Sequence, residues 1–122
     1  MLLFFMIFLH ILDDWVLQGQ LGLMKQKSWW LNHPEYKDMY KHDYIVALLT
    51  HAFSWTFMIM LPLAYVANWQ ISVGFIIAFI LNMSIHAVVD DLKANRKKIN
   101  LVVDQAIHIA QIVITFCVFS FV

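Results

Sequence analysis

The sequence predicts an all-α integral membrane protein, folded as an antiparallel bundle of four transmembrane helices. Of its 122 residues 62% are hydrophobic, and the mean hydropathy is +0.73, well above that of an average soluble domain. No Asp, Glu, Lys or Arg occurs from Tyr44 to Val89, a stretch roughly twice as long as a helix needs to cross a bilayer core of about 30 Å. The apolar runs are continuous rather than alternating, which argues against a β-barrel, and they leave almost no polar face for a soluble bundle.

The four spans are expected at about residues 1–18, 45–66, 71–92 and 101–122, within a single transmembrane domain of residues 1–122. The first run has no basic leading segment and no small-residue cleavage site, so we expect a retained helix rather than a signal peptide. A loop at about 19–43, rich in aromatic residues, is expected to lie along the membrane interface. A tight turn at about 67–70 and a short basic loop at about 93–100 complete the bundle.

All eight basic residues fall in the first and third connections, which lie on the same side of a four-span protein: Lys25, Lys27, Lys37, Lys41, Lys93, Arg96, Lys97 and Lys98. The termini and the middle turn carry no charged side chain. The positive-inside rule therefore predicts cytoplasmic charged loops and both termini outside. The net charge of zero gives no basic excess, so no nucleic-acid partner is expected, and the single cysteine, Cys117, excludes a cysteine zinc site.

Histidine and aspartate recur at i,i+4 spacing, which places each pair on one helix face. The order is His then Asp in the first and third spans, but Asp then His in the fourth. Antiparallel helices need this reversal to bring like residues to like depth, about 10 Å below the loops. The residues predicted as metal ligands are His10, Asp14, His51, His86, Asp90, Asp104 and His108.

Ionisable groups at that depth are costly unless they are satisfied, and a shared divalent cation would satisfy them. Mixed imidazole and carboxylate ligands suit Zn best, and Mn or Fe also. Seven candidates allow two ions, or one ion with the remaining residues orienting its ligands. Gln105 is expected to hydrogen-bond the ligands from outside the metal centre. The alternative is a set of hydrogen-bonded helix pairs without metal, and Asp13 is expected to be a solvated or helix-end charge.

Four segments resemble a family of short bacterial and phage membrane proteins, catalogued as domain-of-unknown-function family three-three-zero-seven: residues 10–18, 24–27, 86–94 and 104–108. The resemblance covers nearly the whole chain and implies that Asp14, rather than Asp13, matches the family aspartate after His10. It implies a bacterial inner (plasma) membrane and supplies no activity. The sequence is more loosely similar to membrane-bound metal-dependent hydrolases, which implies a hydrolytic role.

Three functions follow as hypotheses. The first is a metal-dependent hydrolase of a phosphate-bearing lipid, with Asp14 and Asp90 as catalytic residues and Lys25, Lys27 and Lys93 as substrate-binding residues. The second is a structural or regulatory protein stapled by its metal. The third is a metal or proton transporter, which is disfavoured because the outer halves of the spans are nearly all apolar. Membrane lipids are the expected partners, and a homo-oligomer is left open.

Overall fold

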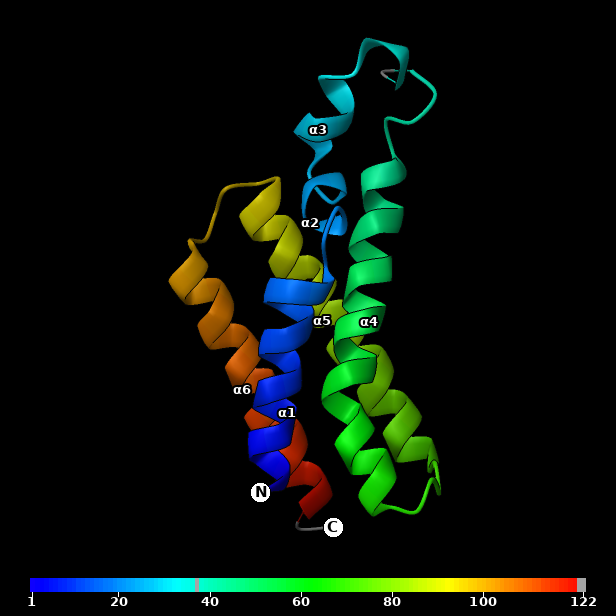
Figure 1. Cartoon of the computed structure of the whole chain (residues 1–122), viewed down its shortest axis with the longest axis vertical. Coiled ribbons are helices and arrows are strands. Elements are labelled where there is room, and N and C mark those ends of the chain that lie inside the picture. The colour runs from blue at the N-terminus through cyan, green and yellow to red at the C-terminus, as the bar shows by residue number, and fades with distance from the viewer. Residues whose placement is uncertain (37, 121–122) are drawn as a thin grey trace.

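The computed structural model describes residues 1–36 and 38–120, and within those residues the fold is entirely helical, with no strand (Figure 1). Lys37 and the last two residues of the predicted 101–122 span lie outside the described part of the chain. The elements are α1 (Leu2–Ile11), the π-helix η1 (Leu12–Leu17), α2 (Leu21–Met24), α3 (Lys27–Leu31), the 3₁₀ turn η2 (Pro34–Tyr36), α4 (Asp43–Val66), α5 (Val73–Ala94) and α6 (Leu101–Ser120).

Three helices in the described residues, α4, α5 and α6, are long and apolar enough to cross a membrane. Their bounds differ by no more than two residues from the predicted second to fourth spans, apart from the undescribed C-terminus. In the first predicted span the α-helix has 10 residues, and six π-helical residues continue it. A crossing by this shorter element stays a prediction.

The long helices run antiparallel, so both charged connections lie at one end of the molecule (Figure 1). The two termini and the turn between α4 and α5 lie at the other end. Asn68 and Trp69 make this turn with positive φ angles of 50° and 63°, and the hydroxyl of Ser72 then accepts a hydrogen bond from the Phe75 amide at 3.1 Å, which caps α5. The predicted interfacial loop contains α2, α3 and η2, of which α2 and α3 pack against α4.

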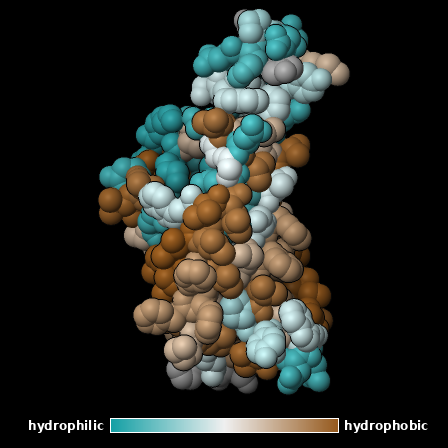
Figure 2. All heavy atoms as spheres, in the orientation of Figure 1, coloured by the Kyte–Doolittle hydropathy of each residue, from teal (hydrophilic) through white to brown (hydrophobic). Residues whose placement is uncertain are grey.

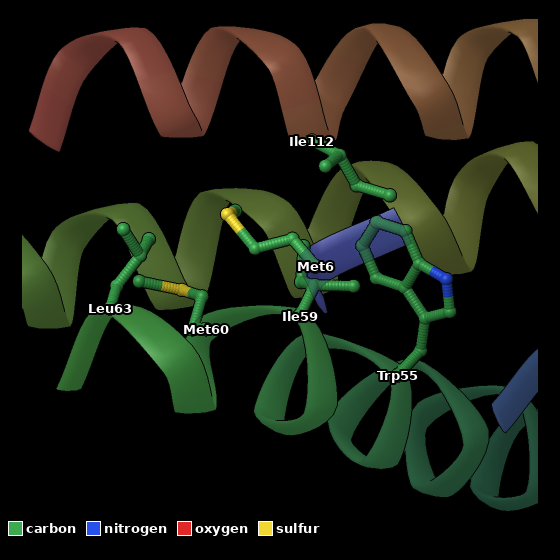
Figure 3. Close-up of a cluster of buried hydrophobic side chains, with 6 residues drawn as sticks. All are labelled: Met6, Trp55, Ile59, Met60, Leu63 and Ile112. Carbon is green, nitrogen blue, oxygen red and sulfur yellow. The ribbon is translucent and has the colours of Figure 1, made fainter. Parts of the chain in front are cut away.

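Figure 3 shows the apolar core, a cluster of buried hydrophobic side chains between the helices. It consists of buried side chains from α1, α4 and α6, namely Met6, Trp55, Ile59, Met60, Leu63 and Ile112. Hydrophobic side chains also cover much of the lower surface in Figure 2, while hydrophilic ones gather around the charged loops. This surface pattern fits a protein whose outer face meets lipid rather than water.

Candidate metal centre

Five helical segments bring histidine and aspartate together at the level where the apolar core ends. α1 supplies His10, η1 supplies Asp14, α4 supplies His51, and α5 and α6 each supply one histidine and one aspartate. The side chains are buried, with residue exposures between 0 and 5%: His10, Asp14, His51, His86, Asp90, Asp104 and His108. A buried set of this composition needs an internal partner, because bare ionisable groups are costly away from water.

The imidazole rings form one contiguous cluster, as the predicted equal depth requires. The ring of His86 lies 4.1 Å from that of His108 and 5.0 Å from that of His51, centroid to centroid. The ring of His10 lies 6.0 Å from that of His108. The reversed His/Asp order of α6 therefore does place its histidine beside that of α5.

Several nitrogen and oxygen atoms face one another without bonding. Nε2 of His108 lies 3.5 Å from Oδ1 of Asp90 and 3.4 Å from Oδ1 of Asp104, and Nε2 of His86 lies 3.6 Å from Oδ2 of Asp90. Within the described chain, both nitrogens of His86, Nε2 of His108 and the Oδ1 atoms of Asp90 and Asp104 are buried without a hydrogen-bond partner. These separations exceed a normal hydrogen bond, but ligands about 2.0–2.2 Å from a tetrahedral ion lie about 3.3–3.6 Å apart.

Three overlapping groups in the described residues offer ligand atoms within 4.8 Å of one another. They are Asp14 with His51 and His86, then His86 with Asp90 and His108, and finally Asp14 with Asp104 and His108. Each group combines carboxylate and imidazole, a donor set that suits Zn, Mn or Fe. The buried His/Asp cluster can therefore hold a metal ion.

His10 has a different environment from the other three histidines. The indole N–H of Trp55 donates to its Nδ1 at 2.7 Å, so Nε2 carries the proton and donates to Oε1 of Gln105 at 3.1 Å. His10 belongs to none of the three ligand groups formed by the described residues. The sequence predicts His10 as a metal ligand. In the structure both of its ring nitrogens are hydrogen-bonded, and the side chain supports Gln105.

Two glutamine side chains orient the cluster. The Gln105 amide donates to Oδ2 of Asp14 at 2.8 Å and to Oδ2 of Asp104 at 3.0 Å. The Gln111 amide donates to the backbone carbonyl and side-chain oxygen of Asn82, which leaves its Oε1 to accept from Nδ1 of His108 at 3.3 Å. This contact turns Nε2 of His108 toward the carboxylates of Asp90 and Asp104, where it could bind a metal once it has lost its proton.

The expectation that Asp13 is a solvated or helix-end charge is wrong. Asp13 is 1% exposed, accepts a hydrogen bond from the Ser54 hydroxyl at 2.6 Å, and lies 3.8 Å from Nδ1 of His51. The cause is η1, where Gln18 bonds back to the carbonyl of Asp13 in the i→i+5 pattern. The wider turn brings two consecutive aspartates to the buried face, which α-helical spacing alone did not suggest.

The three lysines predicted to bind substrate lie in different places. The ammonium of Lys25 is buried and lies 2.6 Å from Oδ2 of Asp90, and that of Lys93, partly exposed, lies 2.6 Å from Oδ2 of Asp104. Lys27 is exposed, and its backbone N–H donates to the Asn95 side chain at 2.7 Å. Two lysines thus border the cluster directly, and the third stands on the loop above it.

Sequence reasoning missed two residues that support the cluster. Trp55 stacks on the His86 ring at 4.2 Å in addition to its bond to His10. Its position one turn after His51 was the available signal. Asn95 fastens the loop over the site, because its amide donates to the Lys25 carbonyl at 3.1 Å and its oxygen accepts from the Lys27 amide. No sequence pattern marks that role.

Comparison with known proteins agrees with the resemblance of the sequence motifs. No curated protein and no solved structure matches the sequence. A family described as "Protein of unknown function (DUF3307)" matches over residues 2–122, nearly the full length. The chain, with three helices long and apolar enough to span a membrane and its buried His/Asp cluster, belongs to this family.

Proposed function

We propose that this chain is an integral-membrane metalloenzyme that uses its buried His/Asp cluster to hydrolyse a phosphate-bearing lipid or a similar substrate. The observation that carries the proposal is a set of buried ligand atoms without hydrogen-bond partners among the described residues: Nε2 of His108 faces Oδ1 of Asp90 at 3.5 Å and Oδ1 of Asp104 at 3.4 Å, and both nitrogens of His86 lie beside them unpaired. Buried polar atoms of native proteins nearly always have partners. A divalent cation would satisfy these atoms together, and no single protein hydrogen bond can.

Two ions fit the cluster best. Among the described residues, the group of Asp14, His51 and His86 and the group of Asp14, Asp104 and His108 share the carboxylate of Asp14. Any other two of the three groups share an imidazole. A carboxylate bridges two ions with its two oxygens. One Asp14 oxygen lies 3.1 Å from Nε2 of His51, and the other accepts from Gln105, which also contacts Asp104. Asp14 therefore supports a pair of ions, for which Zn is the first choice and Mn or Fe the alternatives.

Ions at this position would polarise a phosphoryl group and make a bound water more acidic. Asp90 is placed to accept a proton from that water, since its buried Oδ1 has no hydrogen-bond partner among residues 1–36 and 38–120. Its Oδ2 is held by Lys25 at 2.6 Å. The protein ligands in the two bridged groups number three for each ion, which leaves positions for water and substrate.

The orientation of the chain follows from its charge. We place α1 with η1 as a fourth, short span, both termini outside, and the charged loops in the cytoplasm of a bacterial cell. The substrate would then approach from the inner leaflet. A cysteine introduced at Lys98, in a Cys117→Ser background, should resist an impermeant thiol reagent in intact cells; rapid labelling would refute this orientation.

A structural staple is the second candidate, and the depth of the ligands favours it. Six residues supply the three groups, and each is at most 5% exposed. In lipid, apolar side chains give helices little reason to choose one another, so a metal would stabilise the bundle strongly. The two functions differ in turnover: a staple binds metal and hydrolyses nothing.

Elemental analysis and a hydrolysis assay on purified protein test the proposal together. The wild type and His42→Ala, which changes an exposed histidine, should carry the same amount of metal, whereas His86→Ala should lose it. With added Zn or Mn, the wild type should release phosphate from a lipid phosphomonoester, and Asp90→Asn should not.

Helical circular dichroism and gel filtration keep a folding failure separate, and His86→Gln provides a less disruptive variant. Wild-type protein that is free of metal after growth with Zn or Mn would refute the metal centre. Metal without activity on any phosphoester would support the staple instead.

A further inference from the structure

A small polar cavity lies at the charged end of the bundle, next to the buried His/Asp cluster. Its volume is about 280 Å³, and its walls come from η1's end, α2 and the end of α5. The lining residues are Gln18, Gly22, Lys25, Gln26, Lys93, Ala94 and Lys97. Of these residues three are lysines, two are glutamines and none is acidic, so the cavity offers hydrogen-bond donors to an anion.

Two of the lysines belong to the cavity and to the cluster at once. Lys25 and Lys93 line the cavity, and their ammonium groups lie 2.6 Å from Oδ2 of Asp90 and Oδ2 of Asp104. An ammonium has three N–H donors, so each lysine retains two after bonding its aspartate. An anion in the cavity could therefore bind the same two ammonium groups that bond the carboxylates of Asp90 and Asp104.

In the described part of the chain, the third lysine of the cavity, Lys97, forms no ion pair with the aspartates of the cluster. Lys97 is exposed, has a positive φ of 53° in the loop after α5, and lines the cavity. Gly22 also lines it, and a Cβ there would stand 3.3 Å from the Gln18 side chain. The buried Oε1 of Gln18 has no partner among the described residues, and its amide N–H bonds the Asp14 carbonyl.

The charge of the whole assembly indicates the charge of the ligand. Four buried carboxylates (Asp13, Asp14, Asp90 and Asp104) face two ammonium groups (Lys25 and Lys93), a formal charge of −2 when the histidines are neutral. Two divalent ions would change this charge to +2. A dianion then restores neutrality among these buried groups, where the dielectric constant is low, while water screens the charge of the exposed Lys97.

We propose that the cavity lined by Lys25, Lys93 and Lys97 binds the dianionic phosphate of a phosphomonoester, and that this group is the part of the substrate that the protein recognises. The inference rests on the proposed metal centre, and it names the substrate class of that centre. A phosphodiester carries one negative charge and would leave the site positive. The phosphate can belong to a lipid headgroup or to a soluble ester, since both present the same oxygens to the lysines.

The test is calorimetric titration of inorganic phosphate into the full chain, purified in nanodiscs of phosphatidylcholine and loaded with Zn or Mn. Lys97→Gln and Lys98→Gln form a matched pair, since both remove one charge from adjacent exposed residues but only Lys97 lines the cavity. Lys98→Gln should bind phosphate as the wild type does. Lys97→Gln should bind it at least fivefold more weakly, and Lys93→Gln more weakly still.

Equal phosphate affinity for Lys97→Gln and Lys98→Gln, with metal content unchanged, would overturn the inference and leave the metal centre standing. Wild-type protein that binds no metal would refute the proposed function; phosphate binding that still depends on Lys97 would then keep the anion site alone. Nanodiscs containing phosphatidic acid identify the source of the phosphate. Competition with inorganic phosphate in the wild type indicates a lipid headgroup, and its absence indicates a soluble ester.

Discussion

Around Ile59 and Ile112 the helices meet through apolar side chains, whereas one to two turns nearer the charged loops they meet through histidine and aspartate. Trp55 belongs to both regions, because it is part of the apolar core and also stacks on His86. In a bilayer, apolar contacts distinguish poorly between a neighbouring helix and a lipid tail. The polar end is directional, since each imidazole and carboxylate needs a particular partner. The apolar end thus contributes packing, and the polar end determines which helix faces meet. Substitutions at the two ends should therefore have different effects on stability and on metal binding.

The largest effect is expected from Asp14→Asn at the polar end. If Asp14 bridges the ions as proposed, this change removes a ligand of both, so metal content and hydrolysis should fall by more than about 100-fold, the upper loss when only an outer hydrogen-bonding partner is removed. Elemental analysis and phosphate release measure both quantities. Asp38→Asn is the control, because Asp38 is exposed in the interfacial loop and belongs to none of the three ligand groups of the described residues, so it should matter little. Full metal content in Asp14→Asn would show that this residue bridges nothing.

Removal of the metal should lower the free energy of unfolding, because the metal would supply much of the stability of the polar end. At a free metal concentration 100 times the dissociation constant, binding stabilises the folded state by about 2.7 kcal/mol. A chelator should therefore lower the unfolding temperature of the wild type in detergent but leave that of Asp14→Asn unchanged. An identical decrease in both proteins would mean that the chelator acts elsewhere.

Gln105→Ala is expected to weaken metal binding by about 10- to 100-fold, as is usual when a ligand loses the group that orients it. The amide contacts both Asp14 and Asp104, so its loss frees two carboxylates at once. Competition against a chelator of known affinity measures the change. Gln70→Ala, in the exposed turn at the opposite end, should bind metal as the wild type does. Equal affinities for the two variants would remove Gln105 from the site.

Ile112→Ala at the apolar end should have the smallest effect and no influence on metal. Large-to-small changes in soluble cores cost about 2–5 kcal/mol, but in lipid the transfer part largely disappears, which leaves about 1–2 kcal/mol for the cavity. Unfolding in detergent measures it. The matched control is Ile114→Ala on the same helix, where the side chain is 63% exposed. Loss of metal in Ile112→Ala would show that the two ends are not separable.

Much of this architecture could be predicted because its signals are local. Uncharged runs identify the long helices, and the i,i+4 spacing with its reversal in α6 predicts a common depth for His86 and His108. The short first helix, by contrast, contains a π-turn that no periodicity announces, so the burial of Asp13 was missed. The bond from Trp55 to His10 also depends on how α1 lies against α4, which is a tertiary choice.

Asn95 holds the loop over the cluster, and this contact would affect the rate of metal exchange without changing the affinity for metal. Two hydrogen bonds from this one amide hold the backbone at Lys25 and Lys27, and each is worth only about 0.5–1.5 kcal/mol. Lifting that backbone, with the release of the Lys25–Asp90 pair, uncovers the cluster while α4, α5 and α6 stay packed. The proposed ions and substrate would therefore exchange through a local opening. The Asn95 side chain would set how often this opening occurs, whereas the ligands would determine the equilibrium affinity.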